Sequence, residues 1–463
     1  MSQFFKLDVQ AADLLQYFAA VAAEPWAMLL DSAANHHINS RFDILVARPV
    51  ATLVYQHAQL TQTENGQHQC LQMDPFAALQ QLIGRYFPHK PIRSEAPDLP
   101  FVGGALGYFG YDLGSVIEPV PQAADAGALL PDMAIGIYLW ALILDKQHKQ
   151  LWYVDYRGNA AENWTETSQF FHKTARPTSF ALSSTWQANM DKASYCQKFE
   201  QIQNYLKSGD CYQINLAQRF EASYHGDEWQ AYLTLRSKNA APFSAFLRLP
   251  QGAVLSVSPE RFLQLKAGQV ETKPIKGTRP RFADAQLDKQ SAEELQAAPK
   301  DRAENVMIVD LLRNDLGKHC VPGTVKVPAL FAIESFPAVH HLVSTVTGTL
   351  SPNADASDLL RGAFPGGSIT GAPKVRAMQI IAELEPNCRS VYCGAIGYIN
   401  SQGDMDTNIA IRTLVMTQGK VYCWAGGGIV ADSMVDAEYQ ETFHKVNKIL
   451  PLLTQATVVH SAD

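Results

Sequence analysis

Short apolar runs alternate with turn-forming stretches over the first 170 or so residues of this 463-residue chain. Runs of this length, bounded by Gly, Pro, Asn and Asp, favour β-strands. We expect strands at residues 42–46, 135–144 and 151–156. No group of residues in this part has the pattern of a catalytic site.

A segment rich in Pro, Ser and Thr at residues 174–185 is typical of a linker. After it, apolar residues recur at helical spacing over 191–208, and Gly209 follows as a helix stop. We therefore place the main boundary at 185, with domains at 1–185 and 186–463. Further strand-like runs mixed with helices favour an α+β domain over repeated βαβ units. These runs are 254–257, 270–273, 395–399 and 420–425.

Composition narrows the class of protein. With 47% hydrophobic and 18% charged residues, the chain is expected to be globular and soluble. Lys and Arg number 38 against 45 Asp and Glu, a formal charge of −7 that gives no general attraction to nucleic acid or anionic membranes. The seven cysteines include no Cys-x-x-Cys pair, which favours reduced thiols in the cytoplasm. Near the start, acidic residues interrupt the apolar ones, so neither export nor a membrane span is expected.

Four cations and two prolines lie within the ten residues 272–281. A solvated basic loop and a reactive amine both fit this composition. Lys276, beside Gly277, could approach a ligand closely, and we expect its neighbours Lys273, Arg279 and Arg281 to disfavour its protonated form.

Two pairs of carboxylates are predicted on helices. Asp301 and Glu304 begin one apolar helix, while Glu438, Glu441 and Lys445 share one face of the last helix. Such pairs are common on solvated surfaces. If the fold brings the two pairs together, they would form an oxygen site suited to Mg²⁺.

Two glycine-rich segments, 366–374 and 425–433, each lead into a predicted helix. Bare glycines before a helix can bind an anion through backbone N–H groups, although a simple tight turn fits equally well. Neither segment has the residue order of a phosphate-binding P-loop.

Together these segments resemble the chorismate-utilising enzymes, the family of the anthranilate, aminodeoxychorismate, isochorismate and salicylate synthases. The similarity covers roughly residues 190–450 and extends to two N-terminal motifs. The matching segments are 258–262, 274–281, 301–315, 341–344, 366–374 and 426–445, with 29–32 and 103–112 in the N-terminal part. The resemblance implies an α+β fold of two packed antiparallel β-sheets with the helices outside, and intertwined halves.

Lys276 distinguishes subclasses within this family. Anthranilate synthases resemble one another in carrying a small residue at this position, whereas aminodeoxychorismate synthases carry lysine. The resemblance implies that the amine adds to ring carbon 2 of chorismate as the 4-hydroxyl departs, so that ammonia must add at carbon 4. The expected product is 4-amino-4-deoxychorismate, a precursor of 4-aminobenzoate and folate.

The resemblance also implies roles for other residues. Glu260 would be the general acid for the departing hydroxyl, and His341 would lie near the reacting ring. Glu304 and Glu441 would bind Mg²⁺ directly, with Glu438 and Asp301 holding its waters. The residues expected to bind substrate are Gln213, Thr278, Tyr392, Arg412, Gly426, Gly427 and Lys445.

Gln213 lies where the water-using members have a lysine that activates water, and an amide cannot be that base. This favours ammonia as the nucleophile, and hence a glutamine amidotransferase as its source. No glutaminase motif is present in these 463 residues, so we expect the amidotransferase to be a separate subunit in a heterodimer. Leu30 and Ser32 resemble the part of anthranilate synthases that binds tryptophan. An aromatic effector site and a purely structural pocket both remain open there.

Two other functions are weighed against this one. An anthranilate synthase large subunit is disfavoured by Lys276. A non-catalytic, chorismate-binding regulatory subunit is disfavoured because Glu260, Lys276, Glu304, Arg412 and Glu441 occur together.

Overall fold

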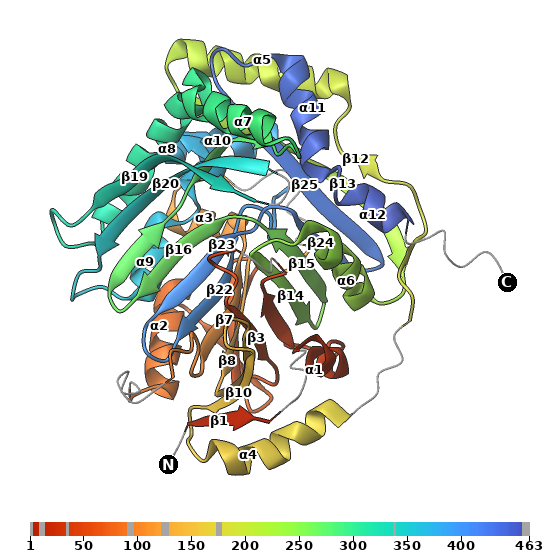
Figure 1. Cartoon of the computed structure of the whole chain (residues 1–463), viewed down its shortest axis with the longest axis vertical. Coiled ribbons are helices and arrows are strands. Elements are labelled where there is room, and N and C mark those ends of the chain that lie inside the picture. Colours follow the sequence, from red (N-terminus) through yellow and green to blue (C-terminus); the bar gives the residue numbers. More distant parts are fainter. Residues whose placement is uncertain are drawn as a thin grey trace.

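The computed structural model describes residues 3–8, 14–33, 37–89, 97–121, 129–172, 178–336 and 339–455. Two large antiparallel sheets form the centre of the molecule, and the helices lie outside them (Figure 1). A continuous hydrophobic core contains residues from both sheets, such as Val254 of the first and Leu53 and Leu263 of the second. The predicted α+β fold with two antiparallel sheets is confirmed.

The first sheet has thirteen strands within the described residues. Eleven of them run in the order β1 (Phe4–Leu7), β10 (Gln150–Asp155), β9 (Trp140–Asp145), β3 (Phe42–Val46), β2 (Met28–Asp31), β14 (Phe243–Leu249), β15 (Gly252–Ser258), β24 (Thr413–Thr417), β25 (Lys420–Ile429), β13 (Gln213–His225) and β11 (Ala181–Leu182). Two short strands, β12 (Gln187–Ala188) and β21 (Gly371–Ala372), also pair with β13.

The second sheet has twelve strands within the described residues. Eleven run in the order β18 (Ile275–Pro280), β20 (Val339–Thr349), β17 (Gln269–Thr272), β16 (Arg261–Lys266), β23 (Met405–Ile409), β22 (Ala395–Asn400), β7 (Gly104–Phe109), β8 (Met133–Tyr138), β4 (Ala51–Gln56), β5 (Gln59–Glu64) and β6 (Gln67–Leu71). The twelfth, β19 (Lys326–Ser335), pairs with β20.

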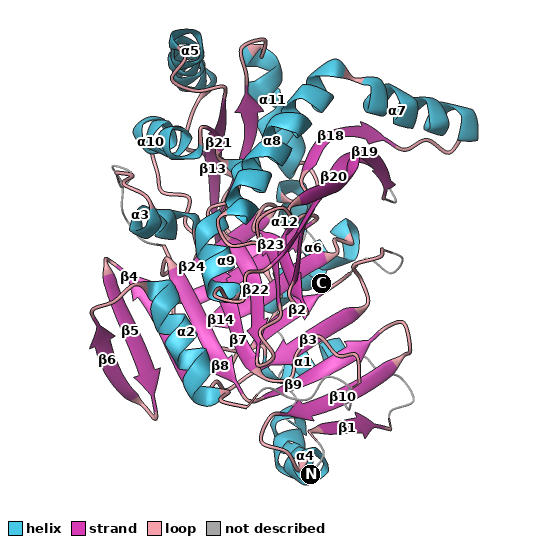
Figure 2. Cartoon of the chain, turned by 90° about the vertical axis from the view of Figure 1, so that its left-hand side faces the viewer, coloured by secondary structure: helices cyan, strands magenta, loops and turns pink. Residues whose placement is uncertain are grey.

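Several helices gather at one end of the molecule, above β13 and β25 (Figures 1 and 2). These are α5 (Lys192–Ser208), α7 (Ala285–Ala297), α8 (Pro299–Gly317), α10 (Lys374–Leu384) and α11 (Val435–Val446). The others are α1 (Leu14–Val21), α2 (Pro75–Tyr86), α3 (Gly114–Ile117), α4 (Ala160–Thr167), α6 (Glu228–Asn239), α9 (Ala356–Ala363) and α12 (Leu450–Gln455), with 3₁₀ turns η2 (Tyr111–Leu113), η3 (Ser168–His172) and η4 (Gly367–Ile369). No described helix combines the length and apolarity needed to cross a bilayer.

Strands from both sides of residue 185 pair within each sheet. Leu30 of β2 lies opposite Ala245 of β14, and Gly107 of β7 lies opposite Gly397 of β22. The first part of the proposed linker, 174–177, lies outside the described residues, and residues 181–182 of its later part form β11 on β13. The domain boundary at 185 stays a prediction.

Local sequence signals fix several elements. The predicted helix at 191–208 is α5: the Asp191 side chain accepts a hydrogen bond from Ser194 N at 2.8 Å, and Gly209 ends the helix with φ of +80°.

The run 135–144 was expected to be one strand but forms two. β8 belongs to the second sheet and β9 to the first, so the chain crosses between sheets at Leu139. Both strands are almost wholly buried, and so the apolar pattern does not show the break.

The second glycine-rich segment also differs from expectation. Gly426, Gly427 and Gly428 are not a turn but the end of strand β25, paired with β13. The turn into α11 comes only after Ile429. Glycine often forms turns, but these three residues adopt an extended conformation because each pairs with a residue of β13.

Candidate active site

Lys276 lies on β18, at the edge of the second sheet. The ladder between β18 and β20 is interrupted between Ile275 and Thr278, and Gly277 in the gap has φ of +83°, a value that glycine adopts at little cost. The Lys276 Nζ donates a 2.9 Å hydrogen bond to the carbonyl of Ser368. The segment, for which a solvated basic loop was one of two open interpretations, is therefore a strand with an irregular register at the lysine.

Burial lowers the pKa of Lys276, while the negative charges of Glu304 and Glu260 oppose that shift. The pKa is lowered as expected, but burial is the largest cause, and the one cation that contributes noticeably is Lys445 of α11. The three cations expected to cause the shift each have a carboxylate partner. The ion pairs are Lys273–Glu334 at 2.5 Å, Arg279–Asp301 at 3.0 Å and Arg281–Asp288 at 2.8 Å.

Glu260 follows the end of β15 and is only 6% exposed. Its Oε1 accepts a 3.0 Å hydrogen bond from the Ser368 hydroxyl. Burial raises the pKa of Glu260, and the Lys276 ammonium works in the opposite direction. A carboxyl with a raised pKa retains its proton at higher pH, as a general acid requires.

The two predicted acidic pairs lie on α8 and α11, as expected. Burial raises the pKa of Glu304 and of Glu438. Burial acts in the same direction on Glu441, but its ion pair with Lys445, at 2.7 Å, more than offsets this and leaves the pKa of Glu441 lowered. A Cβ atom at Gly427 would lie 3.1 Å from Glu438 Oε2 and 3.3 Å from Glu441 Oε1, so a bare residue in β25 leaves room for both acids.

The donor set suits Mg²⁺ in chemical type, since all four groups are carboxylates. Three of them have protein partners: Arg279 pairs with Asp301, Lys445 with Glu441, and the Lys300 Nζ lies 3.7 Å from Glu438 Oε1. Within the described residues, no three Asp, Glu, His or Cys side chains are gathered closely enough to hold an ion as they stand. Metal binding would require these lysine and arginine contacts to rearrange, and the metal ligands stay a prediction.

Three of the residues predicted to bind substrate are cationic or aromatic. Burial lowers the pKa of Arg412, and the negative charge of Glu260 acts in the opposite direction. Tyr392 is buried and stacks on Trp424, with ring centroids 6.1 Å apart. The Lys445 Nζ donates a 2.7 Å hydrogen bond to the carbonyl of Gly426. No carboxylate within the described part of the chain forms an ion pair with Arg412, whose guanidinium could therefore grip an anionic ligand.

His341 lies on β20, and its Nδ1 is 2.9 Å from the Thr278 hydroxyl. Burial, reinforced by the charge of Arg412, lowers the pKa of His341 to about 4. The ring is therefore neutral near pH 7. His340 faces a different environment, with Nε2 3.1 Å from Asp288 Oδ1.

Gln213 begins β13 and is 1% exposed. Its Oε1 has no hydrogen-bond partner among the described residues. An unpaired buried amide oxygen is costly, and a ligand that donates a hydrogen bond would satisfy it.

Ser368 was not predicted as a functional residue, although it touches both Glu260 and Lys276. The segment 366–374 was interpreted only as a possible anion-binding turn. A serine directly after two glycines was the available signal, but its partners lie 92 and 108 residues earlier in the chain.

A second region, which we call the inter-sheet cavity, lies between the sheets and has a volume of about 520 Å³. Leu30, Phe243 and Tyr398 contribute to its lining. Ser32 does not line it; its backbone N–H donates to Asp43 Oδ1 at 2.8 Å, and its own hydroxyl has no partner among the described residues.

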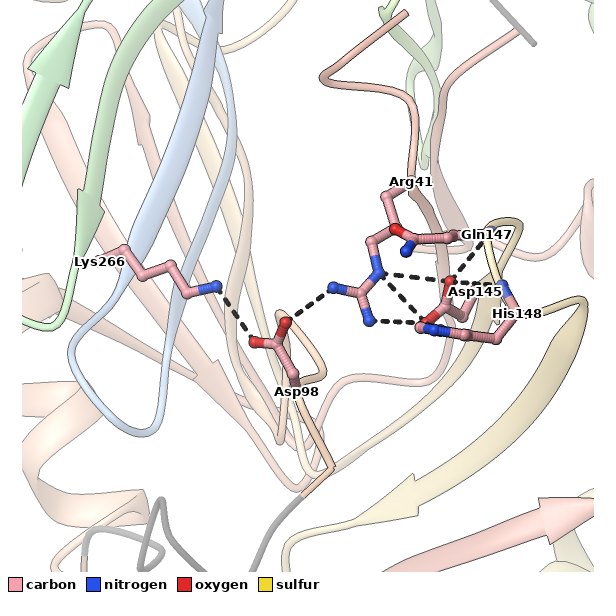
Figure 3. Close-up of polar contacts among 6 residues, drawn as sticks. All are labelled: Arg41, Asp98, Asp145, Gln147, His148 and Lys266. Atoms are coloured by element: carbon pink, nitrogen blue, oxygen red, sulfur yellow. Dashed lines mark hydrogen bonds and ion pairs between the residues drawn. The ribbon is translucent and has the colours of Figure 1, made fainter. Parts of the chain in front are cut away.

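A chain of ion pairs follows one side of the inter-sheet cavity (Figure 3). Lys266 from β16 contacts Asp98 at 3.1 Å, Asp98 contacts Arg41 at 2.7 Å, and Arg41 contacts Asp145 at 2.9 Å. His148 completes the chain, 2.8 Å from Asp145. These contacts connect the two sheets through side chains alone.

Residues 27–451 match the model of the chorismate binding enzyme family, and the chain belongs to that family. The resemblance deduced from the motifs is thereby confirmed. The chain is 55% identical to aminodeoxychorismate synthase component 1 of Escherichia coli (strain K12) over 438 residues, which cover 94% of this chain and 95% of that protein. It is 56% identical to the protein of the same name from Klebsiella aerogenes, with the same coverage.

Anthranilate synthases are more distant relatives. Component 1 of Geobacillus stearothermophilus is 35% identical, covering 96% of this chain and 91% of that protein. Among solved structures, anthranilate synthase component I from Streptococcus pneumoniae TIGR4 matches with a TM-score of 0.77 and 32% identity, covering 90% of this chain and 93% of that one. The fold expected from the motifs is that of these relatives.

Proposed function

We propose that this chain aminates chorismate at carbon 4 and releases 4-amino-4-deoxychorismate, as the synthase subunit of an aminodeoxychorismate synthase. The observation that carries the proposal is the buried amine of Lys276 beside the buried carboxyl of Glu260. The pKa of each group is displaced toward its neutral form, which is the form that a nucleophilic amine and a general acid require. The high identity to proteins named aminodeoxychorismate synthase component 1 supports the same assignment.

In the first step, the Lys276 nitrogen forms a bond to ring carbon 2. The two ring double bonds shift toward carbon 4, and the 4-hydroxyl leaves as water with the proton of Glu260. Lys276 must be neutral at the start, which its lowered pKa favours. The proton it loses on bond formation can pass to a neighbouring carboxylate.

In the second step, ammonia adds at carbon 4, the double bonds return, and the carbon–nitrogen bond to Lys276 breaks. The covalent lysine occupies carbon 2, and this explains why nitrogen does not enter there. Gln213 supports ammonia as the nucleophile because its unpaired Oε1 can accept an N–H hydrogen bond but cannot deprotonate water.

Glu304 and Glu441 would hold Mg²⁺, with Glu438 and Asp301 around it. When bound, the ion would neutralise the ring carboxylate of chorismate and polarise the ring. Arg412, Tyr392, Lys445 and the backbone of Gly426 and Gly427 would bind the two substrate carboxylates, and Thr278 would hold the neutral ring of His341 near the substrate.

The partner follows from the nitrogen source. Free ammonia is scarce at neutral pH, and the relatives' designation as component 1 indicates a second component. We propose a glutamine amidotransferase as that subunit, in a heterodimer in the cytoplasm.

The decisive experiment incubates the purified chain with chorismate, Mg²⁺ and ammonium and identifies the product by mass spectrometry and fluorescence. We expect 4-amino-4-deoxychorismate. Fluorescent anthranilate as the main product would overturn the assignment, and no turnover with either ammonium or an amidotransferase would favour a non-catalytic subunit.

The inter-sheet cavity is proposed as an aromatic effector site, with tryptophan as the candidate. Leu30, Phe243 and Tyr398 would pack against an indole ring. Asp31 and Arg261 at the lining are already paired with Arg236 and Asp406, so the apolar contacts carry this proposal. Isothermal titration with tryptophan tests this. Equal heats for the wild type and for a Leu30→Trp variant that fills the cavity would contradict it.

A further inference from the structure

One residue contacts both reactive groups of the proposed mechanism. The carbonyl of Ser368 accepts the hydrogen bond of the Lys276 amine at 2.9 Å, and its hydroxyl donates to Glu260 Oε1 at 3.0 Å. Ser368 lies in the 3₁₀ turn η4 and is 9% exposed. Neither Glu260 nor Lys276 has an ion-pair partner within 4.0 Å among the described residues. Glu260 also accepts a hydrogen bond from the backbone of Ile275, and Ser368 is the side chain that donates to its carboxyl.

The turn that carries Ser368 is itself held by buried groups. Asn215 Nδ2 donates to the Ser368 carbonyl at 3.3 Å, and the Asn215 backbone N–H donates to the Thr370 carbonyl at 2.8 Å. The fully buried guanidinium of Arg389 donates to the carbonyl of Ile369 at 3.0 Å. A turn braced at three successive residues can hold a side chain in one direction.

We propose that Ser368 is a positioning residue whose hydroxyl directs the Glu260 carboxyl and whose carbonyl holds the Lys276 amine until substrate arrives. The inference rests on the proposed function, because it assumes that Glu260 and Lys276 react. It adds a residue that acts only through these two groups.

The hydroxyl should also change the acidity of Glu260. A donor that bonds a carboxylate stabilises its charged form, so Ser368 lowers the pKa that burial has raised. The charged or titratable groups that face Glu260 from the surrounding elements are Lys276 of β18, Lys445 of α11, Arg412 after β23, and Cys393 before β22. None of these is altered by a substitution at Ser368.

The test measures the pH dependence of 4-amino-4-deoxychorismate formation at a fixed concentration of free ammonia. In Ser368→Ala, we expect kcat to fall about tenfold and the alkaline limb of the profile to move to higher pH by about one unit. In Ser368→Thr, which restores a hydroxyl, the limb should return toward its original position. A fall in kcat with an unmoved limb would mean that the serine only supports the turn, and this would overturn the proposal.

Thr370→Val provides the matched control. The Thr370 hydroxyl donates to the Gly366 carbonyl at 3.1 Å in the same turn but touches neither reactive group. This variant should lose thermal stability without a shift of the alkaline limb. A limb that moves equally in Thr370→Val and Ser368→Ala would also overturn the proposal.

Two further outcomes distinguish failure of the proposed function from failure of the inference about Ser368. If the wild type makes no 4-amino-4-deoxychorismate, the proposed function fails whatever the variants do. If the wild type makes it and Ser368→Ala matches it in rate and pH profile, only the inference about Ser368 fails. Should Ser368→Ala not fold, Ser368→Cys preserves the volume with a weaker donor, and a smaller shift in the same direction is expected.

Discussion

The candidate active site and the inter-sheet cavity both contain many ionisable groups, but they differ in which of these groups have an ion-pair partner. Glu260, Lys276 and Arg412 are buried in the active site without ion pairs among the described residues. At the cavity, Arg41 and Lys266 share the carboxylate of Asp98 (Figure 3). Three charged groups of the active site are thus left without an ion pair, although the acids of α8 and α11 have partners there, whereas the cavity groups drawn in Figure 3 are all paired.

We interpret the unpaired buried charges as serving the reaction and the paired charges as serving the stability of the fold. Burying an unpaired charge costs several kcal/mol, and a chain that retains such groups gains displaced pKa values in return. Exposed ion pairs such as Lys266–Asp98 at the cavity are each worth roughly 0–1 kcal/mol. Substitutions in the two regions should therefore differ sharply in their effects on turnover.

The largest effect is expected from Lys276→Ala. Loss of the nucleophilic amine should lower 4-amino-4-deoxychorismate formation by more than about 10³-fold, and some nitrogen should enter at carbon 2 as anthranilate. Chromatographic product analysis measures both. The matched control is Lys266→Ala at the cavity, which should keep the wild-type rate; equal losses in both variants would erase the contrast between the regions.

Glu260→Gln should lower kcat by about 10²–10⁴-fold, because the amide cannot donate a proton to the departing hydroxyl. The raised pKa keeps the acid protonated to higher pH, so wild-type activity should decline as pH rises through that pKa. Glu271→Gln, which removes a carboxylate 3.3 Å from Arg261 at the cavity, should keep the wild-type pH profile. An unchanged rate in Glu260→Gln would remove the general acid from the mechanism.

The same Glu260 variant should change stability in a pH-dependent way. Because the folded-state pKa lies above the usual 4.5, the folded protein retains a proton that the unfolded chain releases, and stability falls as pH rises between these two pKa values. The Glu260→Gln variant should not show this contribution to the fall in stability, because its amide does not titrate. Urea unfolding of both proteins at pH 4 and pH 8 should show the variant relatively more stable at pH 8.

Glu441→Gln tests the proposed metal site. The Mg²⁺ concentration needed for half-maximal rate should rise at least about tenfold, and chelation by EDTA should abolish the wild-type activity reversibly. Asp436→Asn on the same helix, where the carboxylate pairs with exposed Lys192, is the control and should keep the wild-type requirement. A normal Mg²⁺ response in Glu441→Gln would contradict the assignment.

The smallest effect is expected at the cavity. Asp98→Asn should lower the free energy of unfolding by less than about 1 kcal/mol, and this difference should vanish in 1 M salt because the contacts are exposed. Turnover should be unchanged. A loss of activity in this variant would show that the two regions are coupled.

The sequence predicted the parts of the site that depend on local periodicity. Glu438, Glu441 and Lys445 share a helix face because their spacing follows the helical repeat, and Asp301 and Glu304 lie on α8 as expected. Motif order also indicated the family and, through it, the two antiparallel sheets. None of this required knowledge of which strands pair.

Other features depend on distant partners. The glycines at 426–428 form a strand because β13 lies beside them, and residues 135–144 divide between two sheets. Lys276 has a lowered pKa because the fold buries it, whereas the neighbouring cations that were expected to cause the shift are paired with Glu334, Asp301 and Asp288.

The amino-acid sequence alone therefore determined the family to which the chain belongs and the helical spacing of the acids on α8 and α11, and it predicted the candidate reactive groups. Only the tertiary structure decided which of those groups lose water and which find a partner, and it alone brought Ser368 to Glu260 and Lys276. The physical reason is that desolvation and hydrogen bonding are properties of surroundings, and the surroundings of a buried side chain are assembled from segments far apart along the chain.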